Sequence, residues 1–358
     1  MGTMVYNVND TATQVLAAKQ VKENIFVDLV HKNGYGITQQ EETNVSTLRM
    51  MKVLPTEASA RTVGATKNGA FFNDSNAEVP KVVEYDLNLL YVYDKVYDLP
   101  ELQQDMCPVN ILDETTKNIG GRIATEINAS TIAEQLADRF NAAQKSTAWT
   151  DIAVVLPATG GYYEAIQEAS TMLDDGDEAN GIQAFPFEER EIIMRPTYRK
   201  NLLSDKGILI GGSNYAQSML AKGAVSPDAK KEWGNMYCGE IDLIPCYIAP
   251  KALWNRAGAW TYTSATSEGT TTNTQGSART FADVQAMVCA KSATDRGIST
   301  QDYIKIIDSP NGAGKRLQPK TRWGINICYG KGIVPIVSNG TAAPTAEIKM
   351  VSPGSFAA

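Results

Sequence analysis

The chain has 358 residues, 43% of them hydrophobic and 20% charged, with a formal net charge of -7. This length and composition allow a sizeable core and predict two lobes with excursions rather than one compact unit. The negative net charge and the lack of a Lys/Arg cluster argue against a protein that binds nucleic acid by neutralising the phosphate backbone. The chain has no apolar run of about eighteen residues and no basic start followed by a hydrophobic stretch, so we expect neither membrane insertion nor export by a standard signal.

The first predicted helix covers residues 13–30 and precedes His31, the one histidine of the chain. A single histidine excludes His-rich zinc sites and the HExxH pattern. General-base or metal-ligand chemistry at His31 is the weaker interpretation, because no second histidine accompanies it. An ordinary surface histidine in a turn is the preferred one.

Two extended segments come next. Residues 58–78 are rich in Ala, Thr, Asn, Ser and Gly, and the pair Asn68-Gly69 near their middle predicts a hairpin. Because this segment carries too little apolar material to bury itself, its support is expected from outside the subunit. Residues 83–93 then alternate between apolar and polar, which is the period of a half-buried strand, and prolines bracket them at positions 80 and 100.

A long amphipathic helix is predicted over residues 113–144. Its apolar residues recur every four positions with one five-residue step, at Ile119, Ile123, Ile127, Ile132, Leu136 and Phe140. Asp113 and Thr115 are candidate caps for its start. At 1.5 Å per residue, such a helix is a rod of about 45 Å, as long as a small domain.

Three short motifs after this helix are similar to ligand loops but lack a defining element. Residues 174–178 are acidic without the alternating ligand order of a calcium loop, so a solvated helix end is preferred. Residues 211–213 lack the third glycine of a dinucleotide fingerprint and indicate a tight turn. At residues 312–315, Gly-Ala-Gly-Lys, Ser309 replaces the first glycine of a phosphate loop and Arg316 replaces its magnesium-binding Ser/Thr. A mobile basic turn is the preferred interpretation there.

The remaining polar and reactive residues form no catalytic, cofactor-binding or metal-ligating constellation. Residues 188–191, Glu-Glu-Arg-Glu, are interpreted as a charged surface, with acid/base chemistry by paired carboxylates as the alternative. Residues 264–277, dense in Ser, Thr, Gly and Asn, predict an exposed loop. The five scattered cysteines are interpreted as reduced, buried small residues, with metal binding as a minor alternative: Cys107, Cys238, Cys246, Cys289 and Cys328. The sequence therefore predicts a protein that is not an enzyme and holds no cofactor.

Read in order, these elements resemble those of the major capsid proteins of tailed bacteriophages, the Hong Kong 97 fold, which encapsulin shells share. The resemblance lies in the order and spacing of elements over nearly the whole chain and not in a short motif. After the long helix it includes a helix at 162–173, a strand ending in proline at 191–196, a glycine-initiated strand at 239–245, a buried stretch at 281–290, and strands at 304–308, 320–327 and 332–337.

The resemblance implies an α+β fold of the Hong Kong 97 type. Its parts would be an extended N-terminal arm (1–53), a long E-loop hairpin (54–99), a P-domain (100–198) whose spine helix is the predicted helix 113–144, an A-domain (199–310), and a return to the P-domain with the C-terminus (311–358). Some members crosslink an E-loop lysine to a neighbour's asparagine with the help of a glutamate. Lys67 and Asn326 stand at such places, but no glutamate matches, so a solvated Lys67 is preferred.

The resemblance also implies a function: self-assembly into hexamers and pentamers that form the icosahedral shell around packaged phage DNA. The implied location is the virion capsid, after assembly in the host cytoplasm. The implied partners are further copies of the chain, a separate scaffolding protein and a portal, with weak, non-specific contact to DNA and none to a membrane. Inter-subunit contacts are expected at Lys67, Phe71, Phe72, Tyr91 and Tyr93. For Phe71 and Phe72, packing under their own hairpin is an equal alternative.

Three other functions stay open at this point. An encapsulin-like nanocompartment shell would share the fold and coexist with a cargo enzyme. A tail tube or sheath protein would form tubes and would lack the single long helix. A cytoplasmic α/β enzyme or binding protein would form a small closed oligomer around a pocket.

Overall fold

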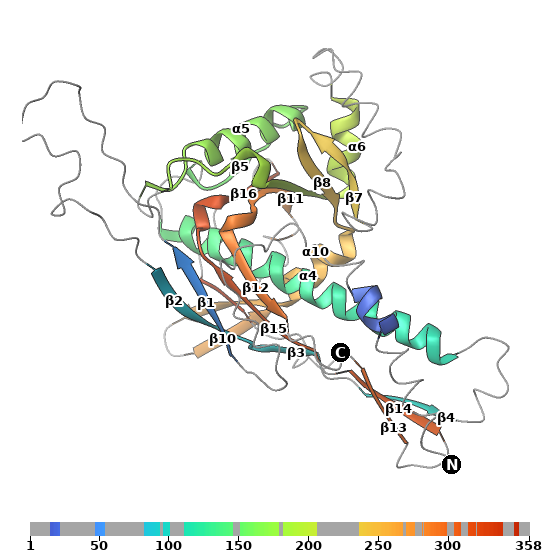
Figure 1. The fold of residues 1–358 in the computed structure, drawn as a ribbon. Coiled ribbons are helices and arrows are strands. Elements are labelled where there is room, and N and C mark those ends of the chain that lie inside the picture. The colour runs from blue at the N-terminus through green and yellow to red at the C-terminus, as the bar shows by residue number, and fades with distance from the viewer. Residues whose placement is uncertain are drawn as a thin grey trace, which may run out of the picture.

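The computed structural model describes residues 15–21, 47–53, 82–93, 96–100, 111–145, 151–178, 182–205, 236–267, 270–275, 281, 283–298, 304–308, 314–319, 321–338 and 347–350. These residues form helices and largely separate sheets, so the fold is of the α+β class, as predicted. Figure 1 shows a long helix running diagonally through the molecule, with the largest sheet on one side and several small sheets on the other.

The long helix is α4 (Ile111–Lys145), and it covers the predicted range of 113–144. Asp113 and Glu114 lie in its first turn, where acidic side chains interact favourably with the helix dipole. From Ile119 onward the helix is buried on most sides, because α10, β15, β16 and β17 all pack against it. The helical segment 15–21 adds a further contact: Gly120 lies so close to it that a Cβ on Gly120 would approach the Cβ of Gln20 to 2.8 Å.

The largest sheet has six strands and mixed direction. Its order is β5 (Val154–Val155), β16 (Ile333–Val337), β11 (Val284–Ala290), β6 (Arg190–Met194), β8 (Ile244–Ile248) and β7 (Tyr237–Ile241). The pairs β5/β16 and β6/β8 are parallel and the others antiparallel. Helices α5 (Tyr162–Asp174) and α6 (Pro196–Ser204) pack on this sheet, and short 3-10 turns occupy Phe187–Glu189, Lys291–Ala293 and Gly330–Gly332.

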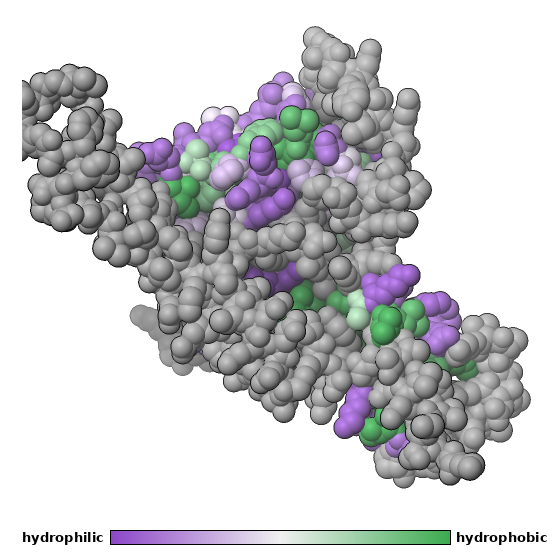
Figure 2. Space-filling view, viewed as in Figure 1, coloured by the Kyte–Doolittle hydropathy of each residue, from purple (hydrophilic) through white to green (hydrophobic). Residues whose placement is uncertain are grey.

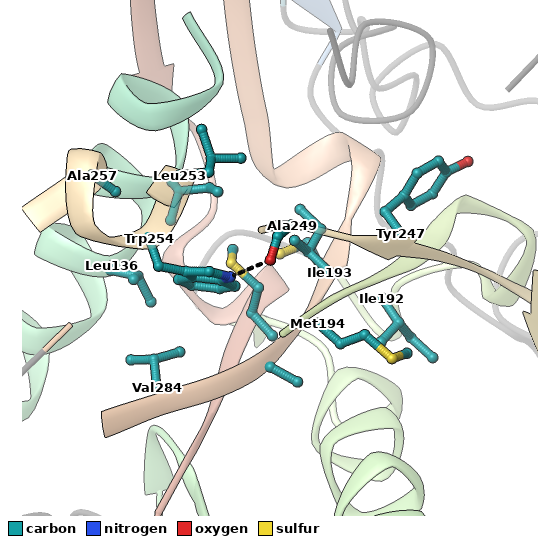
Figure 3. Packing of buried hydrophobic residues seen from close by; sticks show 14 of the residues in the cluster. Leu136, Ile192, Ile193, Met194, Tyr247, Ala249, Leu253, Trp254, Ala257 and Val284 are labelled. Atoms are coloured by element: carbon teal, nitrogen blue, oxygen red, sulfur yellow. Dashed lines mark hydrogen bonds between the residues drawn. The ribbon is translucent and has the colours of Figure 1, made fainter. Parts of the chain in front are cut away.

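The core between the sheet and α4 is centred on Trp254 of α10 (Lys251–Ala259). Its indole lies among apolar side chains from α4, β6 and β11, which include Leu136, Met194 and Val284 (Figure 3). The indole Nε1 donates a hydrogen bond to the carbonyl of Ala249 at 3.1 Å, so the polar atom of this buried ring is satisfied. Full burial of a Trp contributes more to stability than burial of any aliphatic residue.

Four smaller sheets surround this core. They are β1 (Thr47–Val53) with β2 (Val82–Asn88); β12 (Thr294–Ile298), β15 (Thr321–Ile327) and β3 (Tyr91–Tyr93); β13 (Ile304–Asp308), β14 (Gly314–Pro319) and β4 (Tyr97–Pro100); and β10 (Thr270–Gln275), β9 (Thr261–Ser267) and β17 (Ile348–Met350). In Figure 1 the sheets that contain β1 and β13 lie at opposite ends of the lower side of the molecule.

The prediction of one continuous strand over residues 83–93 is wrong. The chain leaves β2 after Asn88 and re-enters a sheet at Tyr91, so β2 and β3 belong to different sheets. A short turn separates them, in which the amide of Leu90 donates to the carbonyl of Asn88 at 3.0 Å. Periodicity alone does not reveal such a break, because the alternation continues across it.

Three further predictions about local structure are corrected. Residues 239–245 form two strands, β7 and β8, joined at Asp242-Leu243, and not one strand. Within the predicted loop 264–277, β9 and β10 pair as a hairpin, since their many threonines favour strands. Gly314 and Lys315 begin strand β14 and do not form a turn.

Candidate assembly surfaces

The β1–β2 ribbon meets the rest of the molecule at β15. A Cβ on Gly324 would lie 2.2 Å from the carbonyl oxygen of Asn88, so glycine is needed where the chain crosses this strand. The seven pairs of the ribbon run from Thr47↔Asn88 to Val53↔Val82 without a shift in register. The ribbon is therefore anchored at one end, and the crossing at Gly324 defines where it leaves the body.

Two large apolar side chains are exposed near strand ends. Leu90 is 74% exposed in the turn between β2 and β3, and Leu243 is 79% exposed at the tip of the β7–β8 hairpin. Leu243 also has a positive φ of 67°, which is unfavourable for a residue with a branched side chain. Leu243 thus combines an exposed apolar side chain with an unfavourable backbone conformation.

The tip of the β7–β8 hairpin is fixed to helix α5. The Tyr163 hydroxyl donates to the carboxylate of Asp242 at 2.9 Å, and burial together with this carboxylate raises the pKa of Tyr163 to about 12. Asp205 accepts the backbone amides of Tyr162 and Tyr163 at 2.7 and 3.3 Å, at the start of α5. The Tyr163 hydroxyl thus connects the hairpin tip to the first turn of α5.

The sheet β13–β14–β4 is held together by ion pairs between neighbouring strands. Arg316 on β14 donates from Nε and Nη2 to the two carboxylate oxygens of Asp98 on β4, at 2.6 and 2.8 Å. Lys315 donates to Asp308 of β13 at 3.1 Å. Two-pronged Arg–carboxylate contacts favour one register, so this sheet has a defined shape despite its small size.

Helix α5 presents a hydrophilic face to solvent in the upper part of the view in Figure 2. Its exposed residues include Glu164, Glu168 and Asp174, and Asp175 follows directly. Such an acidic face repels phosphate groups, which agrees with the net charge of the chain.

The interpretation of residues 188–191 as a charged surface is wrong for the last two of them. Arg190 is buried on an interior strand, where Nη1 donates to the carbonyl and hydroxyl oxygens of Ser170 at 3.0 and 2.6 Å. Nη2 donates to the carbonyl of Phe185 at 2.8 Å and also to Asp174. A run of charges predicts a surface on average, but here a neighbouring helix and turn provide buried partners for the guanidinium.

Glu191 is the strongest candidate for acid/base chemistry in the described residues, because it is fully buried beside Cys289 on the neighbouring strand. Neither of its carboxylate oxygens accepts a hydrogen bond from the part of the chain that the structure describes. Burial raises its pKa to about 8, although Lys291 and Arg296 act in the opposite direction. Since the carboxyl is closed off from solvent, no substrate reaches it, and we assign it no catalytic role.

The described cysteines agree with their interpretation as small residues that are buried or partly buried. Cys238, Cys246 and Cys289 are buried free thiols, and Cys328 is partly buried. Burial raises the pKa of Cys238 to about 12, which opposes thiolate chemistry. Cys107 lies outside the described residues. Among the residues that are described, no group of three or more His, Cys, Asp or Glu side chains is arranged to hold a metal ion.

A cavity of about 420 Å³ lies between strand β4 and the first third of α4. Its lining consists of Tyr97, Thr115, Asn118, Ile119 and Arg122. Among the described lining residues, Arg122 is the one charged side chain.

The predicted contact residues are only partly placed. Tyr91 and Tyr93 lie on β3, opposite Trp323 and Thr321 of β15. Lys67, Phe71, Phe72, His31 and residues 211–213 lie outside the described residues. Sequence reasoning missed Leu90 and Leu243, and no motif marks them, because an exposed leucine is distinguished by its surroundings alone.

No model of a known protein family matches the chain, and no curated protein matches it. Similar solved structures are described as the capsid structure of the Cyanophage P-SCSP1u, a virus-like particle from Pyrococcus furiosus, and the head structure of Helicobacter pylori bacteriophage KHP40. Their identities to this chain are 11% in each case, with TM-scores of 0.45, 0.44 and 0.49. They cover 84%, 91% and 85% of this chain and 85%, 98% and 85% of their own. Likeness at these values carries no argument about function.

Within the described ranges, no helix is both long enough and apolar enough to cross a bilayer.

Proposed function

We propose that this chain is the subunit of a self-assembling capsid shell, a major capsid protein that forms hexamers and pentamers around packaged phage DNA. The observation that carries the proposal is the β1–β2 ribbon, a seven-pair hairpin arm without a third strand in the described part of the chain. An isolated two-stranded ribbon is at best marginally stable in water. A chain that maintains such an arm needs an external surface to stabilise it.

A neighbouring subunit meets this need. Arms that lie across adjacent copies multiply weak contacts, and assembly becomes cooperative because each added subunit completes several contacts at once. The long helix α4 forms a rigid body. The β1–β2 ribbon and the sheet β13–β14–β4 can extend from it in different directions. Exposed Leu90 and Leu243 provide apolar anchors for such contacts.

The finer features implied by the sequence belong to this proposal. They are the N-terminal arm (1–53), E-loop (54–99), P-domain (100–198), A-domain (199–310) and C-terminal return (311–358), with inter-subunit contacts at Lys67, Phe71, Phe72, Tyr91 and Tyr93. The proposal also includes assembly in the host cytoplasm, a separate scaffolding protein, a portal, and weak contact with DNA. The acidic face of α5 supports the last point, since it would not trap the packaged polymer.

Electron microscopy of the expressed chain, with and without a candidate scaffolding protein, tests the proposal. Closed icosahedral shells or rings of six and five subunits are expected. Tubes would favour a tail protein, and a small closed oligomer under every condition would contradict a shell.

A variant adds specificity to this test. Leu90→Ser is expected to abolish assembly and leave the unfolding midpoint of the isolated subunit unchanged, because Leu90 is already exposed. Val96→Ser is the matched control, since Val96 is 45% exposed on the same stretch of chain and lies outside the turn. Equal assembly of the wild type, Leu90→Ser and Val96→Ser would show that Leu90 does not contribute to the interface.

A further inference from the structure

The sheet β10–β9–β17 has one closed edge. On the β17 side, the side-chain amide of Asn141 on α4 pairs with the backbone of Ile348: Nδ2 donates to its carbonyl at 2.8 Å, and Oδ1 accepts its amide at 2.8 Å. This amide takes the place that the peptide group of another strand would occupy. The edge of β17 is therefore satisfied within the subunit.

The opposite edge of this sheet is β10. Its six residues pair with β9 from Thr270↔Ser267 to Gln275↔Tyr262 without a shift in register. In the described part of the chain, β10 pairs on this one side. A regular strand of this length leaves a row of backbone donors and acceptors for a further strand.

Every other sheet edge in the described residues carries a feature that opposes strand addition. Charged residues lie on β1, β2, β4, β12, β13 and β17; β7 has a shift in register; and β3 and β5 have three and two residues. Charge, irregularity and shortness are the means by which proteins block edge pairing. The sequence of β10, Thr-Thr-Thr-Asn-Thr-Gln, has no charge and no proline, and threonine favours strands.

We propose that β10 is a docking strand that pairs antiparallel with β10 of a second copy of this chain, joining two three-stranded sheets into one of six strands. This inference rests on the proposed function, because a shell supplies the second copy at high local concentration. An uncharged strand made mostly of one residue type is complementary to itself. An antiparallel pair about a two-fold axis uses both edges, so the contact closes and does not grow into a fibre.

Cysteine scanning of the full-length chain tests the pairing. Thr271→Cys, Thr272→Cys, Asn273→Cys and Thr274→Cys variants are assembled and then treated with a mild thiol oxidant. A disulfide-linked dimer is expected at the one scanned position nearest the two-fold axis, because only there does a residue of an antiparallel pair face its own copy within disulfide reach. Ala265→Cys is the matched control, since it pairs with Thr272 but lies one strand inside the edge. The wild-type chain reports crosslinking by the native cysteines.

Charge substitutions separate a lost contact from a misfolded chain. Thr272→Lys and Thr272→Glu are each expected to require about tenfold more protein for assembly, because like charges meet near the two-fold axis. A mixture of the two variants is expected to assemble like the wild type. Recovery in the mixture is not expected from a folding defect, which each variant would retain.

The outcomes distinguish this inference from the proposed function. Wild-type shells without crosslinking at β10, or crosslinking of β10 to a scaffolding protein instead of itself, would overturn the inference and leave the shell intact. Crosslinked β10 dimers in a protein that never forms shells would support the strand pairing and contradict the shell. A chain that stays monomeric and does not crosslink would overturn both.

Discussion

Arg256 of α10 binds both carboxylate oxygens of Glu126 on α4, with Nε at 2.8 and 3.0 Å, across 130 positions of the chain. The indole Nε1 of Trp260 donates to the same carboxylate at 3.0 Å. One acidic side chain on the long helix therefore orients the segment that carries the central Trp254. The contact connects α4 to the core of the six-stranded sheet.

Glu126→Ala is expected to lower the free energy of unfolding by about 1–3 kcal/mol, since it removes charge-assisted hydrogen bonds at a largely buried site. Chemical denaturation of the subunit measures this change. Glu114→Ala removes an exposed ion pair with Lys117 and a favourable charge in the first turn of the same helix, and is expected to cost less than about 1 kcal/mol. Equal losses for both variants would show that the Glu126 contact is not special.

Glu191 makes the stability of the subunit depend on pH. Its pKa in the folded chain is about 8, against an ordinary value of 4.5, so the folded state holds a proton that the unfolded state releases. Stability from this group is fully present below about pH 4.5 and is lost as pH rises to about 8. Glu191→Gln is expected to be more stable than the wild type by a few kcal/mol at pH 8.5, with a much smaller difference near pH 5.

Unfolding curves at several pH values test this expectation for Glu191. Glu168→Gln on the exposed face of α5 serves as the control and is expected to follow the wild type at every pH. Parallel pH profiles for the wild type and Glu191→Gln would contradict a buried, protonated carboxyl.

Gly324→Ala is expected to destabilise the crossing between β2 and β15 by about 1–3 kcal/mol or more, because the new Cβ would meet the carbonyl oxygen of Asn88. Gly121→Ala is the matched control: a Cβ there meets nothing within 4 Å, and alanine in a helix is expected to stabilise by about 0.5–1 kcal/mol. Thermal unfolding of both variants tests whether Gly324→Ala lowers the stability and Gly121→Ala raises it. A neutral Gly324→Ala would mean that the chain at residue 88 moves freely away from β15.

Asn141→Ala is expected to release the edge of β17. The amide of Ile348 would then exchange with solvent faster, and stability would fall by about 1–2 kcal/mol for the two lost hydrogen bonds. Hydrogen exchange followed by mass spectrometry of residues 347–350 reports the opening. Asn118→Ala on the same helix should leave this exchange unchanged.

Leu243→Gly separates stability from assembly. Glycine accepts the positive φ of this turn, so the isolated subunit is expected to gain about 1 kcal/mol. Loss of an exposed apolar side chain is expected to weaken assembly at the same time. Unfolding and light scattering on one preparation measure both effects, and unchanged scattering would mean that Leu243 lies outside the contacts.

Elements with a local signal could be predicted from the amino-acid sequence. The four-residue spacing of isoleucines predicted α4, because neighbouring residues within one element already encode its period. The strands that the resemblance implied at 191–196 and 304–308 correspond to β6 and β13. The α+β class came from the resemblance that the order of these elements carries.

Features that depend on partners far away in the chain could not be predicted in this way. The break between β2 and β3 lies where the chain crosses Gly324, and the burial of Arg190 and Glu191 follows from the interior position of β6. In the described residues β10 is an edge strand because it pairs with β9 alone. Burial and edge pairing are properties of contacts between segments far apart in the chain. Local periodicity carries no record of such contacts.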